Sequence, residues 1–494
     1  MKGSASRSLL TDLYELTMAQ GYFNEDRIEE QATFELFFRS NPFDGGYTVL
    51  AGIEEAIAYL DQFSFDRSDI NYLQSLDMFT PDFLDYLADL QFEGEVEGLP
   101  EGSVIFPYEP ILQITGRLPV VQILESALLN LINYPCLIAT KAARIKYSTR
   151  RKETVLEFGL RRAQGDGAIP GARAAVIGGC AGTSNTLAGK IYGLPISGTQ
   201  AHSWIQSFDD ELEAFRSYAR TFPTNTVLLV DTYDTLHSGV PNAIQVAKEM
   251  EARSQSLRGI RIDSGDLAWL SIQAAEMLDK ADLPDVKIVL SSDLDEYVVE
   301  SIVNQISSRM QDKQDQEFTQ RLLGRLLWGV GTKLITGSGG EKAALGGVYK
   351  LVEIAGKPVI KISENRAKTT NPGRKQLWRL KSKKGRWIAD VMGLYGEPAP
   401  QAGDRIYHLS DSTKFLTLDE VEVEPLHHNL LEYYNQDRTK EEVWKEAKNR
   451  AHHLVFEELD ESHLRFLNPH IYKVSLTSKL FGLKQEFLTK HKKS

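Results

Sequence analysis

The pattern of apolar and polar residues changes near residue 153. From there on, short apolar runs typical of buried strands are separated by segments with helical spacing, such as 203–221 and 233–253. The strand-like runs are 154–158, 180–183, 195–198, 226–231, 259–263, 286–291 and 326–330. Alternation of this kind predicts a parallel α/β domain. Because seven runs are more than most open sheets of this length need, we expect an incomplete or irregular parallel (β/α) barrel over residues 151–344.

The flanking segments carry mixed patterns. Before the barrel region, helical spacing at 8–23, 48–63 and 120–150 accompanies strand-like patterns at 33–38 and 93–121, the latter predicting a small antiparallel sheet. After it, three runs predict hairpin strands that complete the first sheet: 348–353, 357–362 and 376–380. We therefore expect a discontinuous α+β domain built from 1–150 and 345–425. A helix-rich C-terminal segment is expected over 426–494.

Composition narrows the class of protein. At 494 residues the chain is too long for one hydrophobic core. A formal net charge of -12 argues against a nonspecific nucleic-acid binder, which would carry a basic surface. The two cysteines imply no disulfide framework. The N-terminus has no apolar signal core, and no apolar run approaches the roughly 20 residues of a membrane span. We expect a cytoplasmic protein with neither nucleic acid nor membrane as a partner.

Polar side chains follow the strand-like runs. They are Arg161, Ser184, His202, Asp231, the stretch from Arg261 to Asp266, Ser292 with Asp293, and Gly331 with Thr332. In parallel α/β domains the residues just past the carboxyl ends of strands meet at one edge. Their convergence predicts an enzyme rather than a binding module.

The residue types suggest which ligands could bind. Arginines suit bidentate capture of carboxylate or phosphate, and the glycines at 329 and 331 would let backbone amides approach a phosphate. Asp263 and Asp266 could bind Mg²⁺, contact ribose hydroxyls or cap the next helix, and capping is favoured for Asp266. The histidine pairs at 427–428 and 452–453 are poor metal sites, because adjacent residues of a helix point about 100° apart.

Several motifs occur in one order along the chain. They are Glu157-Phe-Gly-Leu-Arg-Arg162, Gly182-Thr-Ser-Asn185, Gly198-Thr-Gln-Ala-His-Ser203, Val230-Asp-Thr-Tyr-Asp234, Ile260-Arg-Ile-Asp-Ser-Gly-Asp266 and Gly329-Val-Gly-Thr-Lys333. Together with Leu10-Thr-Asp-Leu-Tyr-Glu-Leu-Thr-Met18 and Phe37-Phe-Arg-Ser-Asn-Pro-Phe43, this series resembles the type II nicotinate phosphoribosyltransferase family. The resemblance implies transfer of phosphoribosyl from phosphoribosyl pyrophosphate to nicotinate, coupled to ATP hydrolysis, in the biosynthesis and salvage of NAD.

The resemblance also implies roles for individual residues. His202 falls at the position of a histidine phosphorylated by ATP, Asp231 at that of a carboxylate that contacts it, and Asp263 at that of a residue holding the phosphoribosyl group. The nicotinate ring is expected between Phe158 and Tyr14, with Tyr14 supplied by the other subunit of a homodimer with shared active sites. Arg261 matches the residue at the nicotinate carboxylate, with Thr183 and Ser184 beside it.

Phosphate binding is expected from both parts of the chain. Arg161, Gly331 and Thr332 match the phosphoribosyl and 5-phosphate contacts, and Arg39 is a further candidate. The segment 361–375, with Lys361, Lys368 and Lys375, resembles one that closes over phosphates from the neighbouring subunit; a solvated basic hairpin is the alternative. ATP is expected as co-substrate and Mg²⁺ as the counter-ion of pyrophosphate and ATP, held by substrate oxygens.

Other activities remain open at this point. Relatives specific for nicotinamide carry an aspartate where this chain has Ser184, and serine donates to a carboxylate that an aspartate would repel. A quinolinate enzyme would need further cationic groups for the second carboxylate. A catalytically inactive homologue would require a lesion, and His202, Asp231, Arg261 and Asp263 show none.

Overall fold

The computed structural model describes residues 7–150, 154–309, 313–339, 344–364, 368–411 and 413–492. The chain divides into two compact units, one made of residues 1–140 with 340–494 and the other of residues 141–339. They are called unit 1 and unit 2 below. The division falls inside helix α6 (Glu125–Ser148). Within the described residues, no helix combines the length and the apolar character needed to cross a membrane.

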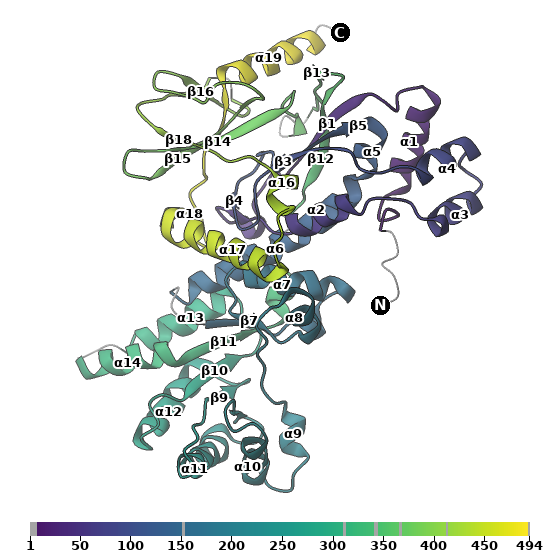
Figure 1. The fold of residues 1–494 in the computed structure, drawn as a ribbon. Helices are drawn as coiled ribbons and strands as arrows, with labels where there is room; N and C mark the ends of the chain where they lie inside the picture. Colours follow the sequence, from purple (N-terminus) through teal and green to yellow (C-terminus); the bar gives the residue numbers. More distant parts are fainter. Residues whose placement is uncertain are drawn as a thin grey trace. The chain divides into compact units, whose positions relative to one another are not determined.

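Unit 2 is built on a parallel sheet, as the alternating pattern predicts (Figure 1). The strand order is β7-β6-β11-β10-β9-β8. The strands are β6 (Thr154–Glu157), β7 (Gly182–Thr183), β8 (Val227–Leu229), β9 (Gly259–Ile262), β10 (Lys287–Ser291) and β11 (Leu326–Val330). Six of the seven expected runs therefore form strands of this sheet.

The seventh run adds only a bridge, in which Ile196 pairs in parallel with Thr183. Since β6 pairs with β11, the first and last strands of the unit are neighbours, as in a barrel. Within the described part of the chain the ladder stays open between Ile196 and β8. The short run around Ile196 contains Pro195, which has no backbone N–H to donate to a longer ladder.

Helices connect the strands of unit 2. They are α7 (Ala168–Ile177), α8 (Thr186–Tyr192), α9 (His202–Gln206), α10 (Glu211–Thr221), α11 (Val240–Glu251), α12 (Leu267–Lys280), α13 (Glu296–Ser307), α14 (Lys313–Arg325) and α15 (Thr332–Ile335). Asp266 caps α12 by accepting from the Trp269 N–H at 3.0 Å, so the capping role expected from the sequence is confirmed. The strands are apolar and buried, with Ile260, Ile288 and Trp328 fully enclosed.

Unit 1 contains two six-stranded sheets and the small pair β2 (Thr48–Val49) and β4 (Val104–Ile105). The first sheet has the order β13-β12-β1-β5-β3-β19. Its strands are β1 (Gln31–Phe37), β3 (Gly94–Gly98), β5 (Leu112–Arg117), β12 (Val348–Ile354), β13 (Lys357–Pro358) and β19 (His428–Asn429). β12 pairs with β1, so a strand from beyond residue 345 completes the N-terminal sheet as predicted.

The second sheet of unit 1 has the order β17-β16-β20-β15-β14-β18. Its strands are β14 (Lys375–Lys381), β15 (Trp387–Leu394), β16 (Arg405–His408), β17 (Phe415–Thr417), β18 (Glu422–Pro425) and β20 (Val474–Thr477). The run at 376–380 was expected in the first sheet; it pairs instead with β15 and β18. A single strand pattern gives the faces of a strand but not its partner.

The helices of unit 1 are α1 (Leu13–Asn24), α2 (Ile53–Asp61), α3 (Arg67–Ser75), α4 (Pro81–Ala88), α5 (Leu118–Ile123), α16 (Leu430–Tyr434), α17 (Lys440–His453), α18 (Glu461–Leu464) and α19 (Ser478–Lys492). Residues 426–494 group with unit 1 and supply strands to both sheets, β19 at one edge and β20 between β15 and β16. They are not a separate helical segment, because the strands β19 and β20 occur beside the helices α17 and α19. The sequence pattern indicated the helices but not these two short strands.

Candidate active site

Polar side chains gather where the strands of unit 2 end. Arg261 belongs to β9 and Asp263 follows it, while Ser291 is the last residue of β10. Because β9 and β10 are parallel neighbours, these three residues share one edge. Arg261 donates to Ser291 Oγ at 2.8 Å and to an Asp263 carboxylate oxygen at 2.7 Å, and the Ser291 hydroxyl donates to that same oxygen at 2.5 Å.

The Nη1 nitrogen of Arg261 extends the network to the loop before α9. It donates to the hydroxyl of Thr199 at 2.9 Å. The side chain of Arg261 is only 13% exposed, so the guanidinium is held in place while a limited face remains open. A fixed planar guanidinium is suited to bidentate binding of a carboxylate or phosphate.

His202 is the first residue of α9 and reaches the same network. Its Nδ1 lies 3.1 Å from Thr232 Oγ1, and its Nε2 lies 3.9 Å from an Asp263 carboxylate oxygen. The longer distance is an electrostatic contact rather than a hydrogen bond. With 40% of the side chain exposed, the imidazole is accessible to a ligand.

Asp231 occupies a different place from the one expected. Instead of contacting His202, its carboxylate accepts from the backbone N–H of Asp263 at 2.8 Å and from the Ser264 hydroxyl at 2.6 Å. The other carboxylate oxygen is buried without a hydrogen-bond partner. Asp231 lies two residues beyond the end of β8 and faces the turn after the neighbouring β9, so it supports the loop of Asp263. Thr232, one residue later, contacts the histidine.

Phe158 and Ser184 lie at the ends of β6 and β7. The Phe158 ring packs over Gly329 of β11, where an added Cβ would come within 2.7 Å of two ring carbons. Glycine at 329 is therefore required by this contact. Both Phe158 and Ser184 are half-buried, which leaves part of each side chain open to a ligand.

Thr183, also expected to contact nicotinate, is fully buried. Its hydroxyl donates to Glu157 Oε2 at 2.5 Å and accepts from the Asn185 N–H at 2.9 Å. A hydroxyl has a single proton, and that proton is already used. Thr183 is consequently a support for the loop that carries Ser184 rather than a donor to a ligand.

The expected phosphate contacts of unit 2 lie on loops after adjacent strands. Arg161 is exposed on the short 3₁₀ turn Leu160–Arg162 that follows β6. Gly331 and Thr332 begin α15 after β11, and Gly331 O accepts from the Ile335 N–H at 3.1 Å. A Cβ at Gly331 would lie 3.3 Å from Phe158 O, so this loop packs closely against the one after β6.

The backbone just beyond Ser291 is strained. Ser292 has φ 127° and Asp293 has φ 39°, values that side chains other than glycine rarely adopt. Residues held in such conformations tend to lie at functional sites, where the surrounding contacts determine the backbone. Here the turn follows the residue that bridges Arg261 and Asp263.

Several contributors to this network escaped the sequence interpretation: Glu157, Thr199, Thr232 and Ser291. Each is within one to four residues of a side chain that the strand-end rule identifies. Their signal was therefore their position beside a predicted residue, since a lone hydroxyl or a buried carboxylate has no characteristic spacing.

The other expected site residues belong to unit 1. Tyr14 lies on α1 with 46% of its surface exposed, and partial burial together with the carboxylates of Glu125 and Glu15 raises the pKa of its phenol. Lys361 and Lys368 are exposed. Residues 365–367 of the same segment lie outside the described part of the chain.

Lys375 departs from its expected role as a phosphate ligand. Its side chain is fully buried, and its ammonium group pairs with Glu35 at 2.9 Å and donates to the carbonyl oxygens of Asn371 and Gly373. Burial lowers the pKa of Lys375, although Glu35 opposes the shift. All three donors of the ammonium are used within unit 1, so we assign this lysine a structural role.

Arg39 lines a cavity of about 1140 Å³ within unit 1. The cationic side chains of Lys414, Lys473 and Lys484 also line it, with Asp44 as its one carboxylate among the described lining residues. The Nε of Arg39 is buried and has no hydrogen-bond partner there. The position is compatible with the expected binding of an anion.

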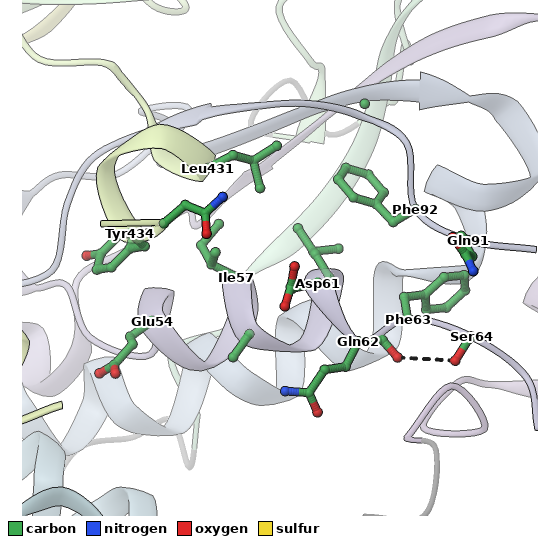
Figure 2. A pocket seen from close by; sticks show the side chains of 14 residues that line it. Glu54, Ile57, Asp61, Gln62, Phe63, Ser64, Gln91, Phe92, Leu431 and Tyr434 are labelled. Carbon is green, nitrogen blue, oxygen red and sulfur yellow. Dashed lines mark hydrogen bonds between the residues drawn. The ribbon is translucent and has the colours of Figure 1, made fainter. Parts of the chain in front are cut away.

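A second cavity of unit 1 has a different character. It measures about 510 Å³, and Figure 2 shows its α2 wall, with Glu54, Ile57 and Asp61, together with Leu431 and Tyr434 of α16. The residues singled out by the sequence do not line it.

Histidines 427, 428, 452 and 453 do not form a metal centre. Over the residues that the structure describes, no group of three or more His, Cys, Asp or Glu side chains is placed to hold a metal ion. His427 contacts Pro110 O through Nε2 at 2.7 Å, and His453 lies between Glu457 and Glu458 at 2.8 Å from each.

Comparison with known proteins identifies the family. Family models for the nicotinate phosphoribosyltransferase N-terminal domain, the nicotinate phosphoribosyltransferase family and its C-terminal domain match residues 9–133, 154–397 and 374–484. A nicotinate phosphoribosyltransferase of Bacillus subtilis is 47% identical over 82% of this chain and 79% of its own. One from Caenorhabditis elegans is 35% identical over 97% and 92%.

The fold leads to the same family. The crystal structure of human nicotinic acid phosphoribosyltransferase matches with a TM-score of 0.80 and 31% identity, covering 97% of this chain and all of that one. A nicotinate-nucleotide pyrophosphorylase from Pyrococcus furiosus shares the fold, with a TM-score of 0.64 at 22% identity over 91% and 96% of the two chains. The chain belongs to the nicotinate phosphoribosyltransferase family.

Proposed function

We propose that this protein transfers the phosphoribosyl group of phosphoribosyl pyrophosphate to nicotinate, releasing nicotinate mononucleotide and pyrophosphate, as a step of NAD biosynthesis and salvage. The observation that carries the proposal is the joined network of Arg261, Asp263 and His202. The partly open carboxylate of Asp263 contacts a fixed guanidinium at 2.7 Å and an accessible imidazole at 3.9 Å.

Recognition of nicotinate is assigned to Arg261, Ser184 and Phe158. Arg261 offers the positive charge that a carboxylate needs, and it is already held by Ser291, Asp263 and Thr199. Ser184 supplies a hydroxyl donor, whereas an aspartate at that position would repel the acid and favour the amide. Phe158 presents an aromatic face for the pyridine ring.

In the transfer step the lone pair of the nicotinate ring nitrogen forms the bond to C1 of the sugar. The bond from C1 to the pyrophosphate oxygen breaks, and pyrophosphate leaves with that electron pair. Because the bond to pyrophosphate breaks ahead of full bond formation to the nitrogen, positive charge develops on the sugar ring in the transition state. A carboxylate held in place by Arg261 and Ser291, as Asp263 is, would stabilise that charge without reorganisation. Arg161, Gly331 and Thr332 are assigned to the phosphoribosyl phosphate.

ATP coupling is assigned to His202. With Nδ1 turned to Thr232, Nε2 is the nitrogen left to react. Its lone pair attacks the γ-phosphorus of ATP, the bond to the β–γ bridging oxygen breaks, and ADP departs. Water later cleaves the phosphorus–nitrogen bond and restores the imidazole. Mg²⁺ would enter with ATP and pyrophosphate, bound mainly by their phosphate oxygens.

A homodimer with shared active sites completes the proposal. Tyr14, Arg39, Lys361 and Lys368 are exposed or line an open cavity of unit 1. We assign them to the site of a second copy, with Tyr14 opposite Phe158 of that copy. Sedimentation of the full chain should give a dimer. An active monomer would mean that these residues do not act at the site of a second copy.

Two finer points of fold and location belong to the same proposal. The ring order of the strands, open beside Ile196, supports an incomplete barrel. Both cysteines are buried, and no disulfide is present among the described residues, which suits a reducing compartment such as the cytoplasm.

The decisive assay offers nicotinate, nicotinamide and quinolinate side by side, each with and without ATP. Nicotinate mononucleotide should form fastest and ATP should accelerate it. Faster product formation from nicotinamide or quinolinate would replace the proposed substrate.

His202→Ala tests the coupling. Removal of the imidazole should abolish ATP stimulation and ATP hydrolysis while slow ATP-independent transfer persists. ATP hydrolysis at the wild-type rate in this variant would refute a phosphohistidine at this position.

A further inference from the structure

Glu157 is a buried carboxylate at the end of β6. It has no role in the substrate binding or the transfer step proposed above. Its side chain is fully enclosed. Burial raises the pKa of this carboxyl group, while the hydrogen bonds from Thr183 and Gly159 oppose the shift. A buried carboxylate is costly unless it is hydrogen-bonded, so its retention needs a reason.

The two oxygens of Glu157 hold two different loops. Oε1 accepts from the backbone N–H of Gly159, in the loop that carries Phe158. Oε2 accepts from the hydroxyl of Thr183, in the loop that carries Ser184. The backbone carbonyl of Glu157 also accepts from the Ser184 N–H at 2.9 Å. One residue therefore joins both walls assigned to the pyridine ring.

The contact with Thr183 has a fixed direction. An ionised carboxylate only accepts, so the threonine hydroxyl must donate to it. The same hydroxyl oxygen then accepts from the Asn185 N–H, which starts the turn into α8. Ser184 lies between two residues whose positions are set by this chain of hydrogen bonds.

The Glu157 carboxylate with its hydrogen bonds to Gly159 and Thr183 is called the clamp below. The space around this clamp is also restricted. A Cβ at Gly159 would lie 2.8 Å from Glu157 Oε1 and 2.6 Å from the Cβ of Ile335. On the same wall, the Phe158 ring packs against Gly329. The loop that carries Phe158 is therefore packed closely around the carboxylate.

We propose that Glu157, through Gly159 and Thr183, is a positioning residue that sets the width of the nicotinate subsite and aims the Ser184 hydroxyl into it. This rests on the proposed function and deepens it. Glu157 touches no substrate. Its effect should therefore fall on nicotinate binding and not on the phosphoribosyl donor or on ATP.

Steady-state kinetics of Thr183→Val, Thr183→Ser and Glu157→Gln in the full-length enzyme test the proposal. Thr183→Val leaves Glu157 Oε2 buried without a donor, so KM for nicotinate should rise about 10-fold or more, with KM for phosphoribosyl pyrophosphate within about twofold of wild type. Thr183→Ser restores the hydroxyl and should return KM for nicotinate to within about twofold. Glu157→Gln keeps a hydrogen bond to each loop but reverses the one to Thr183, so a smaller rise is expected.

The double variant Glu157→Gln/Thr183→Val measures the coupling. If the two side chains act as one clamp, the effect of Glu157→Gln should shrink in the Thr183→Val background; additive effects would overturn the proposal. Glu211→Gln is the control, because Glu211 is also a buried carboxylate of unit 2, bonded to Asn242 at 2.9 Å away from the strand-end network. It should leave KM for nicotinate unchanged.

Thermal unfolding accompanies each assay. A folded Thr183→Val enzyme with wild-type KM for nicotinate would overturn the proposal, as would equal losses for both substrates, which indicate a merely structural role. If Thr183→Val does not fold, Glu157→Gln compared with Glu211→Gln decides instead. A wild-type enzyme that does not use nicotinate would refute the proposed function itself, before any variant is compared.

Discussion

Two of the protein's arginine–aspartate pairs differ in what surrounds them. In unit 1, Arg379 and Asp390 form two hydrogen bonds, at 3.0 and 2.6 Å, with side chains 2% and 0% exposed. In unit 2, Arg261 and Asp263 form one at 2.7 Å, with side chains 13% and 26% exposed.

The remaining partners of the two pairs make the difference clear. Arg379 also donates to Val104 O and stacks 3.6 Å from the Trp387 ring centre, while Tyr472 donates to Asp390 at 2.9 Å. Asp263 has one oxygen bound by Arg261 and Ser291, and its second oxygen lies 3.9 Å from His202 Nε2. The closed pair stabilises the fold, whereas the open pair keeps charge available for a ligand.

Breaking the closed pair should give the largest effect on stability. Arg379→Met removes the cation but leaves Asp390 buried beside Glu109, so we expect a loss of about 3–5 kcal/mol in the free energy of unfolding. Denaturant unfolding measures it. The control is Arg216→Met, because the Arg216–Glu249 pair is about one-third exposed and its loss should change the free energy of unfolding far less. Equal losses in the two variants would contradict the comparison.

The open pair should show the opposite balance. Asp263→Asn keeps the shape but removes the charge that faces the sugar, and kcat should fall about 10²–10³-fold. Stability should change little, because Asp263 is partly exposed. Asp266→Asn, three residues later, is the matched control, since asparagine caps a helix as well as aspartate does and activity should persist. Collapse of the fold in Asp263→Asn with no specific kinetic loss would assign the open pair a structural role instead.

The choice between nicotinate and nicotinamide should depend on Ser184, the residue next to Thr183 of the clamp. Ser184→Asp places a carboxylate where the nicotinate carboxylate is expected. The preference should shift toward nicotinamide by about 1–3 kcal/mol in the ratio of kcat/KM values. The same change at the exposed Ser301 of α13 controls for added charge. An unaltered ratio would remove Ser184 from the recognition argument.

The smallest expected effect is a pH dependence of stability that comes from unit 1. Burial lowers the pKa of His427 in unit 1 to about 4 from an ordinary 6.5. The folded protein therefore binds this proton less readily than the unfolded chain, so stability is present above pH 6.5 and is lost as pH falls toward 4. In wild type, this contribution should be about 1–2 kcal/mol between pH 7 and 5, and it should vanish in His427→Gln. An identical pH slope in both proteins would dismiss His427 as its source.

Much of this arrangement follows from the sequence. The period of apolar residues placed the strands of unit 2, because a buried parallel strand needs a short apolar run and a helical return. Arg261, His202 and Asp263 were predicted to meet because residues past the carboxyl ends of parallel strands share one edge. Asp266 was predicted as a cap because it directly precedes an apolar helix.

Other features were decided by tertiary contacts. The sequence could not show that Thr232 rather than Asp231 contacts His202, because adjacent residues after a strand point to different sides and the turn geometry decides which one faces the imidazole. It could not show that Lys375 is buried against Glu35, since the two belong to distant segments joined only by folding. The direction of the Thr183 hydroxyl likewise depends on a buried carboxylate from another strand. Local periodicity determines which elements form, while the partner of each polar side chain depends on distances that only the folded chain defines.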